Sequence, residues 1–148
     1  VDLQPLMHDD LVLVQARPPG LALDPPPSPV AVDTLQDMPL VIPSRPNAIR
    51  MHVEAQLGAR GLRPAVALEI DGVQAILDLV ADGVGAALLP PYAVARSLRP
   101  SAYLVTPLAA PGLRIPVSVA LSRTRPATRT LHAALALLRD VASRVAQP

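Results

Sequence analysis

The chain has 148 residues, of which 51% are hydrophobic and 17% charged, and this balance predicts one globular domain rather than a disordered chain. It contains no cysteine, which excludes structural disulfides, thiolate metal sites and a cysteine nucleophile. No apolar run approaches the roughly 18 residues that a membrane-spanning helix needs, so we expect no membrane partner. Because the chain opens on Val1 instead of Met, we expect residue 1 to be a cut end.

The net charge of +1 is unevenly distributed along the chain. Residues 1–95 hold 5 Arg against 11 Asp and Glu, whereas residues 96–148 hold 8 Arg against Asp140 alone. A basic half of this kind can indicate a nucleic-acid surface, or two halves that partly neutralise each other or face different neighbours. The second interpretation is favoured because the arginines are scattered and Tyr103 is the only aromatic residue among them.

The first third of the chain predicts two short strands separated by a loop. Leu11–Val14 is a continuous apolar run, typical of a strand buried on both faces of a sheet. The proline-rich segment 17–29 favours an extended loop, and residues 39–42 form the next apolar run.

The segment PSRPNAIRMHVEAQLGAR, residues 43–60, predicts a helix that starts directly after a strand. Ile49, Val53 and Leu57 recur every four residues as one buried stripe, and Pro46 suits a first helical turn. Ligands bind at such strand ends in open α/β sheets, because unpaired N–H groups point there. Ser44, Arg45 and Asn47 are therefore candidate binding residues; alternatively, Ser44 only caps the helix and Arg45 is solvated.

The segment RPAVALEIDGVQAILDLVADGVGAALLP, residues 63–90, predicts a strand, a helix and a second strand parallel to the first. Residues 65–70 and 84–89 are short apolar runs, while the residues between them repeat at helical spacing. Asp71 is the predicted N-cap, Gln74 its capping-box partner, and Gly83 the C-terminal stop. This unit indicates an α/β domain.

The last third predicts a short helix, two strands and a long helix. The strand at 113–122 alternates and contains Pro116, which indicates an edge strand or a strand that begins there. The long helix spans 126–146 and carries one apolar stripe, which favours packing on a sheet over a coiled-coil seam. The short helix is expected at 92–98, the other strand at 102–106, and the stripe consists of Leu131, Leu135, Leu138, Ala142 and Val145.

The sequence shows no catalytic or metal-binding motif. His8, His52 and His132 are not spaced as metal ligands, and no G-x-S-x-G nucleophile motif occurs. The Gly83-Val84-Gly85 stretch precedes a strand instead of following one, which argues against a dinucleotide fingerprint. We therefore expect neither an enzyme nor a bound metal or cofactor.

Several motifs together resemble the effector-binding domain of LysR-type transcriptional regulators. They are the PLV-x-PS-x-P entry into a helix at 39–46, the G-x-x-P at 61–64, Glu69 at a strand end and LV-x-x-G-x-G-x-x-x-LP at 79–90. The last motif is the most specific. The flanking segments agree, so the resemblance covers about residues 3–145, although Leu21 departs from the His-Pro-Leu sequence frequent in the family.

The resemblance implies a Rossmann-like subdomain of the type 2 periplasmic-binding-protein fold, with the closing strand and helix of the other subdomain. Residues 1–12 would be the end of subdomain I and the hinge strand, residues 13–112 the effector-binding subdomain II, and residues 113–148 the return strand and closing helix of subdomain I. The family's winged helix-turn-helix, its linker helix and the first half of subdomain I would lie outside these residues.

The resemblance also implies a function. Effectors in this family bind between the two subdomains, which places Ser44, Arg45, Pro46 and Asn47 at the helix start and Asp71, Gly72 and Val73 on the neighbouring loop. The expected partners are a small organic acid or other metabolite, a second copy of the full-length protein, and DNA through the winged helix-turn-helix, all in the cytoplasm. The alternative is one lobe of a periplasmic solute-binding protein, which a secretion signal upstream would favour.

Overall fold

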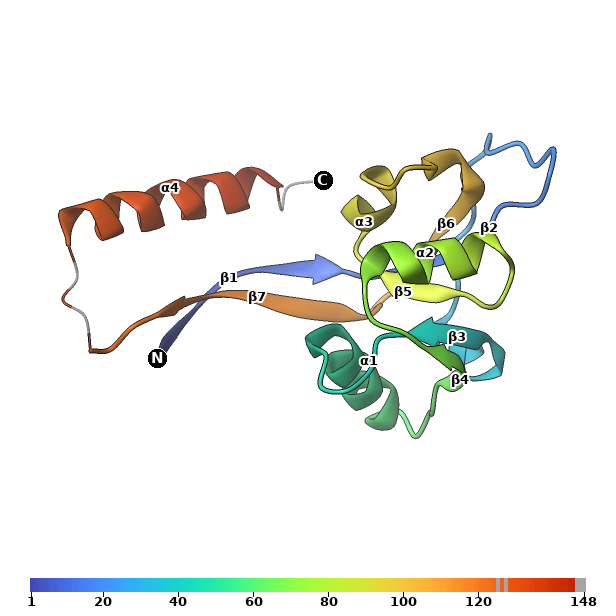
Figure 1. The fold of residues 1–148 in the computed structure, drawn as a ribbon, viewed down its shortest axis with the longest axis horizontal. Helices are drawn as coiled ribbons and strands as arrows, with labels where there is room; N and C mark the ends of the chain where they lie inside the picture. Colours follow the sequence, from blue (N-terminus) through green and yellow to red (C-terminus); the bar gives the residue numbers. More distant parts are fainter. Residues whose placement is uncertain (125, 127, 146–148) are drawn as a thin grey trace. The chain divides into compact units, whose positions relative to one another are not determined.

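The computed structural model describes residues 1–124, 126 and 128–145, and the chain divides into two compact units (Figure 1). The larger unit comprises residues 10–113, and the smaller comprises residues 1–9 and 114–148. The elements of the larger unit are β2 (Val12–Ala16), η1 (Val32–Asp37), β3 (Pro39–Ile42), α1 (Ala48–Gly58), β4 (Ala65–Glu69), α2 (Val73–Ala81), β5 (Ala87–Leu89), α3 (Pro91–Ala95), η2 (Pro100–Ala102) and β6 (Tyr103–Pro107).

The strands of the larger unit form a mixed sheet. β2 pairs antiparallel with both β5 and β6, and β3 pairs parallel with β4. A single parallel bridge between Leu40 and Ala86 connects β3 to β5, so the strand order is β4-β3-β5-β2-β6. The predicted strands at 11–14, 39–42 and 102–106 are all present, and the proline-rich segment 17–29 forms no helix or strand.

The predicted strand-helix-strand unit is confirmed as β4-α2-β5. Both strands run parallel to β3, which lies between them. The helix buries Ile76, Leu77 and Val80 in an apolar cluster of the unit, where Val14, Val41, Leu89 and Tyr103 from the sheet meet them. The helical spacing in the sequence therefore marked the face of α2 that covers the sheet.

The predicted start of α2 is wrong, and its predicted end is confirmed. The N-cap is Gly72, whose φ of 96° only glycine adopts readily, and no side chain caps this helix. The carboxylate of Asp71 instead accepts a hydrogen bond from the N–H of Ser44, and Gln74 donates to Asp78 one turn along the same helix. Gly83 follows the C-cap with φ of 77°, and its N–H donates to the carbonyl of Val80.

β4 lies at the edge of the sheet, and all five of its residues are exposed. The apolar run at 65–70 predicted a strand, but its side chains are not buried in this chain. Val66 and Leu68 are 43% and 39% exposed, and Val73 at the start of α2 is 44% exposed. Three apolar side chains on neighbouring elements are therefore accessible at this edge.

The smaller unit contains the paired strands β1 (Asp2–Asp10) and β7 (Arg114–Leu121) and the helix α4 (Arg129–Val145). β7 includes Pro116 and alternates between inward and outward residues, as the sequence predicts. The predicted stripe of α4 is only partly correct, because Leu135 and Ala142 are buried while Leu138 is 46% exposed. The side chain of Val145 and residue 146, which belonged to that prediction, lie outside the described residues. No helix in the described part of the chain is long and apolar enough to cross a membrane.

Gly85 holds β5 against β3. A Cβ atom at this position would lie 2.6 Å from the carbonyl oxygen of Pro39, which itself accepts a hydrogen bond from the N–H of Ala86 at 2.8 Å. The N–H of Val41 donates to the carbonyl of Ala86 at 2.8 Å, so a side chain at 85 would push apart the two bonds that join the strands.

We expect Gly85→Ala to lower the free energy of unfolding by about 2 kcal/mol, because the added methyl group meets backbone that cannot move away. Chemical denaturation measures this. Gly58→Ala is the matched control: Gly58 ends α1 with open space around it, so the same change there should be neutral or stabilise by about 0.5 kcal/mol. Equal losses at both positions would contradict the close-approach argument.

Candidate functional site

The candidate site lies where β3 and β4 end. The loop at 43–47 follows β3 and the loop at 70–72 follows β4, and parallel pairing brings both loops to the same edge of the sheet. The N–H of Ile70 donates to the carbonyl of Ile42 at 3.0 Å, and the N–H of Ser44 donates to Oδ1 of Asp71 at 3.0 Å. The two loops predicted to form the site are therefore in direct contact.

Asn47, not Ser44 or Pro46, starts α1. Its side-chain oxygen accepts hydrogen bonds from the N–H groups of Ile49 at 2.9 Å and Arg50 at 3.3 Å. The alternative prediction that Ser44 caps this helix is therefore wrong. Because the oxygen of Asn47 faces the helix, its amide N–H₂ points away from it, and it has no protein partner among the described residues.

The other predicted site residues lie around this turn. Arg45 and Pro46 are exposed, and Nη2 of Arg45 donates to Oε2 of Glu54 at 2.8 Å. Gly72 is exposed on the second loop next to Asp71, and Val73, the first residue of α2, is exposed as well. The two loops meet at Ser44 and Asp71, and Arg45 is drawn toward α1 instead of standing free.

Arg50 is a site residue that the sequence analysis missed. It is only 7% exposed, and its guanidinium binds three groups: Oε1 of Glu54 at 2.9 Å, Oε1 of Glu69 at 2.8 Å and the carbonyl oxygen of Pro43 at 3.0 Å. One side chain thus joins α1 to the ends of β3 and β4. The available signal was Arg50 and Glu54 at i,i+4 beside an apolar stripe, with Glu69 at the end of a neighbouring strand.

The ion pairs shift the pKa values of this cluster. The hydrogen bonds that Arg50 donates to Glu69 and Glu54 raise its pKa further above its already high value, despite burial. Burial of Glu54 would raise its pKa, but the bonds from Arg45 and Arg50 outweigh burial and lower it. The bond from Arg50 likewise lowers the pKa of Glu69. The side chains of Arg50, Glu54 and Glu69 are therefore charged at neutral pH.

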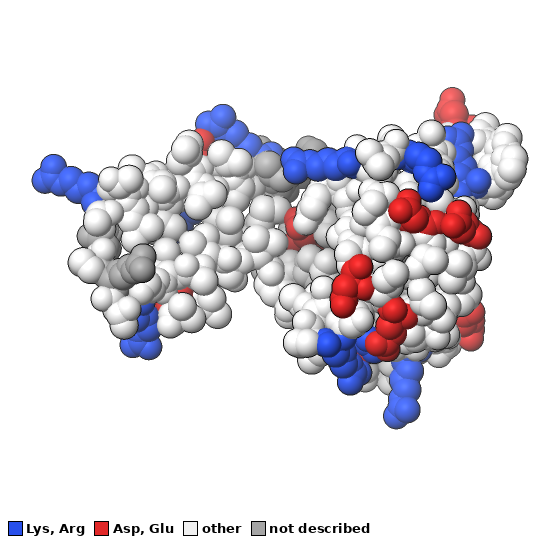
Figure 2. All heavy atoms as spheres, in the orientation of Figure 1, with Lys and Arg blue, Asp and Glu red and all other residues white. Residues whose placement is uncertain are grey.

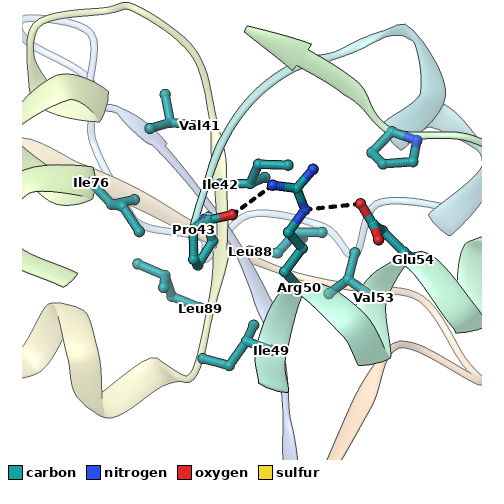
Figure 3. A pocket seen from close by; sticks show the side chains of 11 residues that line it. Val41, Ile42, Pro43, Ile49, Arg50, Val53, Glu54, Ile76, Leu88 and Leu89 are labelled. Atoms are coloured by element: carbon teal, nitrogen blue, oxygen red, sulfur yellow. Dashed lines mark hydrogen bonds and ion pairs between the residues drawn. The ribbon is translucent and has the colours of Figure 1, made fainter. Parts of the chain in front are cut away.

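A small apolar pocket lies behind the Arg50 cluster (Figure 3). Its volume is about 20 Å³, which is room for one water molecule. Its lining residues include Ile49, Val53, Ile76 and Leu89, with the guanidinium of Arg50 bonded to Pro43 and Glu54 at its rim. This volume is too small for a metabolite, so the pocket itself is not a candidate effector site.

The charged side chains of the larger unit are mixed rather than segregated. Arg99, from the basic half of the sequence, pairs with Asp78 at 3.3 Å, and Figure 2 shows Arg and Asp or Glu side chains together on this face of the larger unit. The arrangement favours mutual neutralisation over a nucleic-acid surface. Among the described residues no group of His, Asp and Glu is placed to hold a metal ion.

The chain matches the model of the LysR substrate binding domain over residues 1–143. It belongs to this family. It is 35% identical over 99 residues to the nitrogen assimilation regulatory protein nac of Escherichia coli K12, a match that covers 66% of this chain and 30% of that protein. The LysR match favours a regulator over the alternative of a periplasmic solute-binding lobe.

Solved structures agree on the fold. The effector-binding domain of QuiR in complex with shikimate superposes with a TM-score of 0.71 at 16% identity, over 97% of this chain and 66% of that one. The regulatory domain of CcmR from Synechocystis PCC6803, in complex with 2-PG, superposes with a TM-score of 0.75 at 19% identity. This match covers 95% of this chain and 66% of that one. The predicted fold class, an α/β unit of the periplasmic-binding-protein type as in LysR effector domains, is therefore confirmed.

We expect Arg50→Met to lower the free energy of unfolding by about 1–3 kcal/mol, because Glu54 and the carbonyl of Pro43 lose a charged donor. Arg50→Lys should recover only part of this, because an ammonium group cannot reach three acceptors in the geometry of a guanidinium. Urea denaturation of the three proteins measures the difference. An Arg50→Met variant as stable as the wild type would contradict the conclusion that Arg50 joins α1 to the ends of β3 and β4.

Glu54 and Glu69 also predict a pH dependence. A carboxyl group whose pKa is lowered on folding stabilises the protein above its unfolded pKa, and this contribution is lost as pH falls through the folded pKa. The free energy of unfolding of the wild type should therefore decrease as the pH falls below 4.5, the ordinary pKa of a glutamate carboxyl group. Glu69→Gln should flatten that part of the profile, measured as Tm between pH 7 and pH 3, and an unchanged slope would count against the pairing.

Proposed function

We propose that this chain is the effector-sensing part of a LysR-type transcriptional regulator. In the longer protein, a winged helix-turn-helix domain would bind DNA in the cytoplasm, and the effector would control that binding. The observation that supports this most directly is the contact between the loops after β3 and β4, made by Ser44 and Asp71 in a chain of the LysR family. This is the edge of an α/β sheet at which ligands bind.

The effector that this site favours is a small organic acid. The donors at the mouth are the amide of Asn47 and the hydroxyl of Ser44, both on half-buried residues, and the remaining N–H groups of the exposed Arg45. Donors of this kind suit carboxylate and hydroxyl oxygens. Two structural relatives are complexes with shikimate and 2-PG, which supports this class of ligand. The subdomain that lies opposite in the family would supply the remaining contacts.

The full-length protein would be a homo-oligomer. The outer edge of the sheet supports this, because Val66, Leu68 and Val73 are each more than a third exposed on the adjacent elements β4 and α2. The family resemblance assigns these two elements to the side-by-side pairing of effector domains. Burial of such side chains against a second copy is favourable by about 25 cal/mol for each Å² removed from water.

The proposal is tested at Asn47, which has two separable roles. Asn47→Ala should lower the free energy of unfolding by about 1 kcal/mol through loss of the helix cap, and it should abolish the effector response. Asn47→Asp keeps an oxygen that caps the helix and retains stability, but a carboxylate there repels an acidic effector, so the response should also be lost.

The response is measured as effector-dependent promoter activity of the full-length regulator, with Tm recorded for each variant. The control is Asn47→Ser, which caps the helix without adding charge and should leave part of the response. A normal response in the Asp variant would remove Asn47 from the site and contradict the proposal.

A further inference from the structure

The peptide unit between Pro43 and Ser44 is held by a charged side chain at each end. Its carbonyl oxygen accepts a hydrogen bond from Nη1 of Arg50 at 3.0 Å, and its N–H donates to Oδ1 of Asp71 at 3.0 Å. A cation at the carbonyl and an anion at the N–H polarise the peptide in the same direction, and linked hydrogen bonds strengthen one another. The N–H of Ser44 is therefore a strengthened donor for a negatively charged oxygen.

The two side chains that bind this peptide differ in burial and in the number of hydrogen bonds that hold them in place. Arg50 is 7% exposed and is fixed by Glu54 and Glu69 in addition to the carbonyl of Pro43. Asp71 is exposed, and within the described part of the chain the N–H of Ser44 is its only hydrogen-bond partner. Rotation of the Asp71 side chain into solvent therefore breaks one surface hydrogen bond, whereas displacement of Arg50 breaks three buried or half-buried bonds.

We propose that the N–H of Ser44 is the receptor for the carboxylate of the effector, and that Asp71 is its internal competitor. The inference rests on the proposed function and deepens it by assigning a role to each loop residue. Asp71 occupies the N–H in the absence of ligand, and an anionic effector replaces it while Arg50 keeps the peptide in place. A neutral ligand accepts a weaker hydrogen bond than the carboxylate it would have to displace, so the competitor also selects for acids.

The experiment measures binding to the intact protein by calorimetry, with shikimate and benzoate as probes and the methyl ester of each as the neutral counterpart. Asp71→Ala should lower the Kd of the two acids about tenfold, which corresponds to one charge-assisted hydrogen bond that no longer has to be displaced. Asp71→Asn should give a smaller gain because its neutral oxygen still accepts from Ser44. The methyl esters should change less than twofold.

Asp82→Ala is the matched control, because it removes the same charge from an exposed position at the other end of α2. It should leave the Kd of every probe unchanged, and Asp71→Ala should shift Tm by only a few degrees. Equal gains for acids and esters, or an equal gain in the Asp82 variant, would overturn the competitor role.

Two further outcomes separate this inference from the proposed function. If the acids bind wild type and Asp71→Ala equally, and Asn47→Asp still abolishes binding, the competitor role is wrong and the site stands. If no acid binds any variant, both the receptor and the proposed acid-sensing function are wrong.

Discussion

The candidate site depends on the buried guanidinium of Arg50. It joins α1, the end of β3 and the end of β4 through Glu54, Pro43 and Glu69, so a helix and the ends of two paired strands meet at one side chain. A buried cation is stable only when its donors are satisfied by acceptors of opposite charge or by carbonyl groups. Arg50 meets this requirement, and its bonds to Pro43 and Glu69 fix the ends of the two strands from which the loops of the candidate site begin.

The same edge of the sheet combines a packed base with a polar rim whose residues are exposed or half-buried. The base consists of β3 between β4 and β5, with Gly85 permitting the close approach to Pro39 and α2 covering the face through Ile76 and Leu77. The rim consists of Ser44, Arg45 and Asn47 on one loop and Asp71 on the other. In this arrangement the packed core positions the loops, and under the proposal the polar contacts at the rim exchange with a ligand.

Much of the fold could be predicted, because periodicity in the sequence reflects local geometry. The apolar repeat within 71–83 identified α2, the short runs identified β3, β4 and β5, and Gly83 marked a helix end. The prediction that Asp71 caps α2 is wrong because its carboxylate bonds to the neighbouring loop instead. Its carboxylate has two possible donors, the N–H groups of its own helix and the N–H of Ser44, and only the spatial pairing of β3 with β4 brings the second within reach.

The sequence by itself determined the membership in the LysR family, the α/β class and the two loops where a ligand would bind, because these follow from motifs and from spacing along one chain. Tertiary structure alone decided that Arg50 is buried, that Asn47 is the cap of α1 and that Asp71 holds the N–H of Ser44. It also decided that β4 is an exposed edge despite its apolar sequence. Such properties depend on which segments become neighbours, and a one-dimensional pattern of residue types does not by itself fix the partner that a given charge or strand finds.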